Sequence, residues 1–188
     1  MNADDIIIYE PKKGKSVRVF RPWEIRSLVR AIPKNEYKDK FEALLYTATR
    51  YKELQWLYEH PNRFHGSSIH IKNTKARVKD AYRYVHLNMQ GQRAVENFLR
   101  SKTNLPTYQS WGENLKRWCI NANIKPDHAC AKSTRKTFES WLVITYPHRT
   151  LEILASVGHE ENTALKHYLM FPFSEQDKRD MLYYVEGW

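Results

Sequence analysis

The chain is poor in cysteine and glycine and contains no long apolar run. Its 188 residues include two cysteines, Cys119 and Cys130, whose spacing matches no zinc-binding pattern. A disulfide framework is therefore not expected, and a reducing cytoplasm is the predicted location. No apolar run approaches the roughly 20 residues of a membrane-spanning helix. The first residues lack the basic start and the small-residue cleavage site of a signal peptide, so none is expected.

The residues that are present are typical of a globular, basic protein. Hydrophobic residues make up 41% of the chain and charged residues 28%, which is not the composition of a disordered chain. The length predicts one domain, or one domain with a short arm. The formal net charge is +10, and a field of this sign attracts polyanions, of which nucleic acid is the commonest. A basic protein with no nucleic-acid role is the alternative that charge alone leaves open.

The pattern along the chain predicts a mainly α domain with one small antiparallel β-hairpin. Residues 1–20 are basic and are expected to form an arm ahead of a domain over 21–188. Alternating segments at 67–73 and 82–87 predict the hairpin, with a basic loop between them. Helical spacing of apolar residues predicts helices over 23–32, 37–59, around 94–99, and over 107–122, 133–146, 149–157, 164–169 and 174–188.

Four short stretches combine basic side chains with the boundary of a predicted helix or hairpin. They are TATRYKEL with Arg50, NTKARVK with Lys75, AKSTRKTF with Lys132 and Arg135, and SVGH with His159. Tyr168 follows His159 by nine positions. Each residue alone has a plain structural explanation, such as a helix-end cation, a solvated loop charge or a helix cap. Their order, the hairpin between them and the spacing from His159 to Tyr168 together favour a catalytic site.

Together these stretches resemble the catalytic domain of the tyrosine recombinase (phage integrase) family, over about 23–188. The first arginine of the family stands in a Thr-Gly-x-Arg-x-x-Glu-Leu context, which the chain matches at Arg50 with Ala48 in place of the glycine. The hairpin lysine of the family corresponds to Lys75, with Lys72 as the alternative.

The remaining motifs of the family fall in the second half of the chain. Its His-x-x-Arg box corresponds to Lys132 and Arg135, and the lysine in place of histidine resembles some archaeal and viral members. Its Leu-Gly-His box corresponds to SVGH, which gives His159, and its nucleophile corresponds to Tyr168.

The resemblance implies a site-specific recombinase or integrase, of the kind that also integrates viral genomes. Such an enzyme cuts and rejoins DNA through a 3′-phosphotyrosine, and the covalent link conserves the bond energy. Tyr168 is the expected nucleophile. Arg50 and Arg135 are expected to donate paired hydrogen bonds to the phosphate oxygens, because guanidinium groups keep their charge and match this geometry.

The other site residues are expected to handle protons and charge. Lys75 is the expected general acid for the leaving 5′-oxygen. Lys132 and His159 are expected to bind the phosphate or to help move the tyrosine proton, with Lys132 acting mainly through its charge. The resemblance implies no cofactor and no metal, and the eight histidines show no ligand spacing.

Double-stranded DNA is the expected partner, and the resemblance implies self-association into a dimer or tetramer on DNA. Basic side chains of the arm and of the surface are expected to neutralise backbone phosphates: Lys12, Lys13, Lys15, Arg18, Lys79, Lys116 and Arg117. A final helix, opened by a capping box at Ser174 and Asp177, either packs on a neighbouring subunit or folds back on its own core.

The chain departs from the family at its start. Most members carry a further helical module that closes a clamp around DNA, whereas here only the segment 1–20 precedes the first helix. We therefore expect either an excised catalytic domain or a short natural version, with weak and salt-sensitive DNA binding. Three other functions stay open: a type IB topoisomerase, which the short chain disfavours, a catalytically silent DNA-binding protein of the same fold, and an unrelated basic helical protein.

Overall fold

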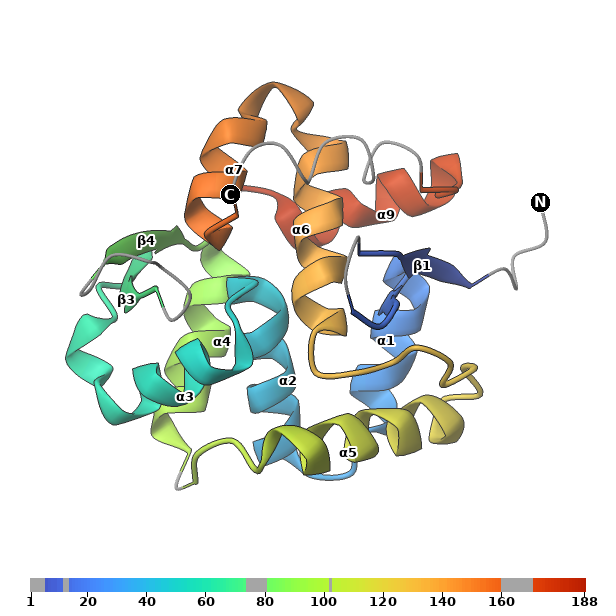
Figure 1. The fold of residues 1–188 in the computed structure, drawn as a ribbon, viewed down its shortest axis with the longest axis horizontal. Helices are drawn as coiled ribbons and strands as arrows, with labels where there is room; N and C mark the ends of the chain where they lie inside the picture. Colours follow the sequence, from blue (N-terminus) through green and yellow to red (C-terminus); the bar gives the residue numbers. More distant parts are fainter. Residues whose placement is uncertain (1–5, 12–13, 74–80, 102, 160–170) are drawn as a thin grey trace.

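Helices make up most of the structure, as the sequence predicts. A computed structural model describes residues 6–11, 14–73, 81–101, 103–159 and 171–188 (Figure 1). The longer helices are α1 (Pro22–Ala31), α2 (Asn35–Thr47), α3 (Tyr51–Glu59), α4 (Met89–Arg100), α5 (Tyr108–Asn121), α6 (Ser133–Thr145), α7 (Thr150–Val157) and α9 (Glu175–Val185). Two short 3-10 helices lie at Pro61–Arg63 and Pro147–Arg149. Within the described ranges, no helix combines the length and the apolarity that crossing a membrane requires.

Two small antiparallel sheets complete the described structure. Strands β3 (Ser68–Lys72) and β4 (Tyr82–His86) form the predicted hairpin, with Ile69 opposite Val85. Strands β1 (Ile7–Tyr9) and β2 (Val17–Val19) form a second pair.

Helix α6 is the central element of the fold. In Figure 1 it runs through the middle of the molecule, with α7 and α9 at one end and α5 across the other. Every residue from Ser133 to Val143 is buried, and Trp141 is completely enclosed. A helix that is buried on all sides packs against several partners, and here they are α2, α7, α9 and β2. Charged side chains on α6 are therefore held inside the molecule, where they need partners.

The single helix predicted over 37–59 is two helices. The apolar spacing continues across the break, so periodicity alone did not reveal it. Ala48 ends α2 in the left-handed conformation, with φ of 47°. The chain turns there, and Arg50 becomes the N-cap residue of α3. The position where the resembling family has glycine is thus one that requires a positive φ.

The structure also differs from the expected arm. Strands β1 and β2 are buried rather than extended into solvent, because Ile7, Val17, Val19 and Phe20 pack in the core. The backbone N–H of Phe20 donates to the hydroxyl of Thr137 on α6 at 2.9 Å.

Two buried ion pairs hold this N-terminal hairpin in place. Arg21 pairs with Asp177 at the start of α9. Arg18 pairs with Glu24 and donates to the carbonyl of Lys125 at 3.2 Å. Arg18, expected to contact DNA phosphates, is therefore buried and occupied within the protein.

The final helix folds back on its own core, which decides between the two alternatives for it. The predicted capping box is present at Ser174 and Asp177. Met181 and Val185 are completely buried. The side-chain amide of Asn88 donates to the carbonyl oxygen of Tyr184 at 2.8 Å. The preceding helix, predicted over 164–169, lies outside the described residues.

The conformation of Ala48 predicts a specific sensitivity. Ala48→Val should lower the free energy of unfolding by about 2 kcal/mol, because a β-branched side chain is strained at positive φ and overfills a site that is 1% exposed. Ala48→Gly should change it by less than about 1 kcal/mol, because relief of strain offsets the loss of a buried methyl group. Urea unfolding followed by tryptophan fluorescence measures both. Equal stability of the two variants would contradict the assigned conformation.

Candidate active site

A buried carboxylate, Glu53, organises the site. It is completely shielded from solvent and accepts hydrogen bonds from the backbone N–H of Arg50 at 2.8 Å and from the Arg50 guanidinium at 2.6 Å. Both oxygens of Glu53 also accept from Arg83 of β4, at 3.1 and 2.8 Å. A guanidinium nitrogen of Arg135 on α6 lies 3.9 Å from the same carboxylate. One carboxylate therefore gathers three arginines from three different elements.

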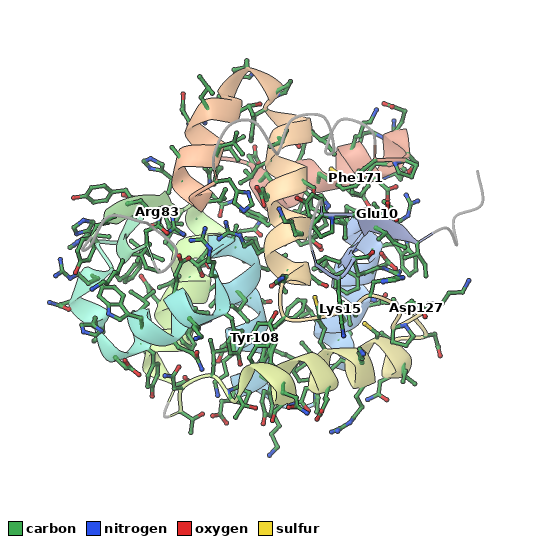
Figure 2. The ribbon with its side chains drawn as sticks, in the orientation of Figure 1. Glu10, Lys15, Arg83, Tyr108, Asp127 and Phe171 are labelled. Atoms are coloured by element: carbon green, nitrogen blue, oxygen red, sulfur yellow. The ribbon has the colours of Figure 1, made fainter. Side chains whose placement is uncertain are left out.

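The C-terminal end of α7 fixes the same three arginines from the other side. Its consecutive carbonyl oxygens at 156, 157 and 158 each accept from a different guanidinium. Arg83 donates to the first at 2.9 Å, Arg135 to the second at 2.7 Å and Arg50 to the third at 2.8 Å. A helix C-terminus carries partial negative charge, so it favours cations at this position. Figure 2 labels Arg83 on the side of the molecule where β4 meets α7.

Glycine at 158 is required by this arrangement. Gly158 ends α7 with φ of 73°, a conformation that other residues adopt at a cost. A methyl group at this position would lie 2.8 Å from Nε of Arg83. The glycine thus allows the helix to end and the guanidinium to approach its backbone.

A second buried carboxylate lies one turn further along α6. Glu139 is completely buried, receives Nζ of Lys136 at 3.2 Å and contacts Nδ1 of His159. The Lys136 ammonium also lies 4.1 Å from the centre of the Tyr9 ring. Glu139 therefore fixes the orientation of the His159 imidazole, which directly follows the helix end that holds the arginines.

Burial and pairing shift the pKa values of these groups. Burial alone would raise the pKa of Glu53, but Arg83 and Arg50 outweigh it and lower the pKa to about 2. The pKa of Glu139 is also held well below its ordinary value, because Lys136, His159 and Arg135 outweigh its burial. Burial lowers the pKa of His159, against the opposing effect of Glu139. At neutral pH the site thus contains two carboxylates and a neutral imidazole.

The structure brings three of the six predicted site residues together. Arg50, Arg135 and His159 meet at the C-terminal end of α7. Lys132 is the N-cap residue of α6 and is exposed, and it lines a separate hollow next to α5. It lies near enough to Lys136 to contribute to the lowered pKa of that side chain, after burial, which is the main cause.

The remaining two predicted residues, Lys75 and Tyr168, lie outside the described residues. The alternative lysine, Lys72, is half-buried at the end of β3. Its neighbour Asn73 accepts a hydrogen bond from the Arg50 guanidinium at 3.0 Å. The start of the basic loop is therefore attached directly to the arginine cluster.

Sequence reasoning did not identify three residues of this site: Arg83, Lys136 and Glu139. A signal for the first was present, because in an alternating strand Arg83 takes the inward face together with Val85. Glu139 stands four residues after Arg135 on α6, which puts both on one face of the helix. Neither position is conspicuous until the carboxylate or histidine from a distant segment is in place.

The arrangement is suited to binding an anion. The side chains of Arg83 and Arg135 are nearly buried, whereas that of Arg50 is 18% exposed. Within the described structure, one terminal nitrogen of Arg135 is buried without a hydrogen-bond partner. Such an unsatisfied donor is unfavourable unless a ligand completes it. No group of three or more His, Cys, Asp or Glu side chains in the described part of the chain could hold a metal ion.

A mainly helical domain with arginines gathered at a helix end is the class of structure seen here, and two solved structures share it. XerA recombinase superposes with a TM-score of 0.64 at 16% identity, covering 93% of this chain and 66% of that one. XerH site-specific recombinase, in a pre-cleavage complex with its difH substrate, gives 0.60 at 16% identity, covering 81% and 50%.

The fold of the chain is therefore that of tyrosine recombinase catalytic domains. The chain spans 66% of the XerA chain and half of the XerH chain. No protein-family model matches the sequence, and no curated protein sequence matches it.

The low pKa of Glu53 predicts how stability depends on pH. Because its folded pKa of about 2 lies below its ordinary value of 4.5, ionised Glu53 stabilises the fold above pH 4.5. This contribution, about 3 kcal/mol, should be lost as the pH falls from about 5 to 2. Urea unfolding at each pH measures it. Glu53→Gln should be less stable at pH 7 and should show a shallower loss in acid. Parallel curves for the two proteins would contradict the assignment.

Proposed function

We propose that the chain is the catalytic part of a site-specific DNA recombinase or integrase, which cuts and rejoins double-stranded DNA. The observation that supports this most strongly is the gathering of Arg50, Arg83 and Arg135 around one helix end, next to an oriented His159. The shared fold with two recombinases adds to it.

In this proposal the arginine cluster binds the phosphate that reacts. Arg50 and Arg135 donate to its non-bridging oxygens, and the partnerless nitrogen of Arg135 is the first donor that a phosphate oxygen satisfies. Glu53 and the carbonyls of α7 hold both guanidiniums in place before DNA arrives. Donors fixed in advance stabilise a charged transition state without reorganising, and loss of one such donor typically slows a reaction about 100- to 1000-fold.

The nucleophile in this proposal is Tyr168. Its phenol oxygen forms a bond to phosphorus, and the bond from phosphorus to the 5′-oxygen breaks. The products are a 3′-phosphotyrosine and a free 5′-hydroxyl, and attack by that hydroxyl reverses the reaction. Neutral His159, held by Glu139, accepts the phenol proton directly or through water.

The leaving 5′-oxygen takes its proton from the hairpin lysine. Lys75 is the proposed general acid, and Lys72 stays the alternative. Lys132 contributes positive charge from the start of α6. DNA is the proposed partner, bound by a dimer or tetramer of the chain. We keep the cytoplasm as the proposed location, where free thiols such as those of Cys119 and Cys130 persist.

A covalent trapping experiment tests the nucleophile. Incubation with a nicked suicide DNA substrate, which releases its short 5′-end after cleavage, should give a protein–DNA adduct that resists denaturant. Tyr168→Phe should give none, because it lacks the attacking oxygen. Gel electrophoresis with labelled DNA measures the adduct. Tyr183→Phe is the matched control, because Tyr183 is 67% exposed on α9, and it should react as the wild type does.

The outcomes of this experiment separate the candidate functions. An adduct with both wild type and Tyr168→Phe assigns the nucleophile to another residue. DNA binding without any adduct favours a catalytically silent protein of the same fold. Absence of both binding and adduct removes the proposal.

Replacing the leaving oxygen with sulfur distinguishes the two lysines. A thiolate leaves without a proton, because its pKa is near 8.5, whereas an alkoxide requires one. Lys75→Ala should cut normal DNA at least about 100-fold more slowly but should cut the 5′-thio substrate nearly as fast as the wild type. Lys72→Ala should show neither effect. The opposite pattern would assign the role to Lys72, and rescue of neither variant would exclude both.

A further inference from the structure

A hollow on the side of α6 away from the arginine cluster is lined by three separate segments. Its volume is about 420 Å³, which is within the range of small-ligand pockets. Lys15 comes from the turn before β2, Tyr108 and Lys116 come from α5, and Cys130 and Lys132 come from the loop that leads into α6. Figure 2 labels Tyr108 at the start of α5, with Lys15 further along the same face.

The charge of this lysine hollow is unbalanced. Its lining holds three lysines and no carboxylate. Lysines elsewhere in the described structure are paired with acids, as Lys40 is with Glu36 and Lys178 is with Glu175. Lys15, Lys116 and Lys132 have no such salt bridge within the described residues. Converging ammonium groups repel one another, so the arrangement favours a bound anion.

Two other features point to a phosphate rather than a simple inorganic anion. The hollow opens at the start of α6, whose first backbone N–H groups carry partial positive charge of the kind that binds phosphates. Tyr108 is 47% exposed at its edge and offers a ring face to a sugar or base. A phosphate with an organic group attached satisfies both.

The lysine hollow is connected to the arginine cluster through two rigid contacts. Lys132 lines the hollow and Arg135, three residues later on α6, belongs to the cluster, so about one helical turn separates them. Tyr108 packs edge-to-face on Tyr51, with ring centres 5.5 Å apart, and Tyr51 directly follows Arg50. One extended polyanion can therefore contact both.

We propose that the lysine hollow is a phosphate-binding site, which holds a backbone phosphate of the DNA strand beside the phosphate that reacts. The inference rests on the proposed function, which it makes more specific. It separates Lys116, which directs its charge into a defined site, from Arg117, which is exposed on the same helix but does not line the hollow.

Modification of Cys130 tests the site in the intact protein. Cys130 lines the hollow and is partly exposed, whereas Cys119 is buried and burial raises the pKa of its thiol to about 12. A thiol reagent should therefore label Cys130 first, as peptide mass spectrometry would identify. Duplex DNA at low salt should slow this labelling several-fold. Tripolyphosphate, tested alone, shows whether a free phosphate compound binds in the same place.

Matched charge removals provide the control. Lys116→Gln should weaken the protection of Cys130 by DNA and lower the slope of log affinity against log salt by about 1. Arg117→Gln removes the same charge one residue away and should leave the protection unchanged. Fluorescence anisotropy with a labelled duplex measures the affinity.

Each outcome bears on the proposal. Protection by DNA that Lys116→Gln weakens supports it, whether or not tripolyphosphate also protects. Protection by tripolyphosphate alone overturns the assignment to a DNA backbone. No protection by either, or equal effects of Lys116→Gln and Arg117→Gln, overturns the site. Protection by DNA in a protein that forms no Tyr168 adduct would retain the phosphate site while removing the recombinase function.

Discussion

The architecture of the candidate site depends on one buried carboxylate and the guanidiniums around it. A charge that is removed from solvent is strongly unfavourable unless it is paired and hydrogen-bonded. Glu53 meets that condition only because α3, β4 and α6 each bring an arginine to it. The positions of the hairpin and of the central helix are therefore linked to a single side chain, and removal of either partner leaves an uncompensated charge inside the protein.

The end of α7 gives this cluster its direction. Three successive carbonyls take one guanidinium each, so the arginines are oriented by backbone that cannot rotate away. The same helix end presents His159, which Glu139 holds from the opposite side. Binding groups and proton acceptor thus belong to one rigid unit, which is the kind of preorganisation that favours stabilisation of a transition state over binding of the ground state.

Sequence patterns predicted the elements better than the interactions between them. Apolar spacing located the helices and alternation located the β3–β4 hairpin, because both reflect local geometry. The break at Ala48 was missed, because the apolar stripe runs through it. Of the site, Arg50, Arg135 and His159 were found through a motif, whereas Arg83 and Glu139 were not. Their roles depend on partners that are 30 and 20 residues away in the chain and that only the folded structure brings near.

The ion pair between Arg21 and Asp177 has a consequence for synthesis of the chain. Its members are 156 residues apart, and Phe20 likewise bonds to Thr137, 117 residues later. The N-terminal hairpin therefore leaves the ribosome long before its partners exist, with Val19 and Phe20 still without the neighbours that bury them. Contacts of such large sequence separation slow folding and leave apolar surface open to association in the meantime. The first segment to be translated is thus among the last to be sealed, and a chaperone has its longest opportunity there.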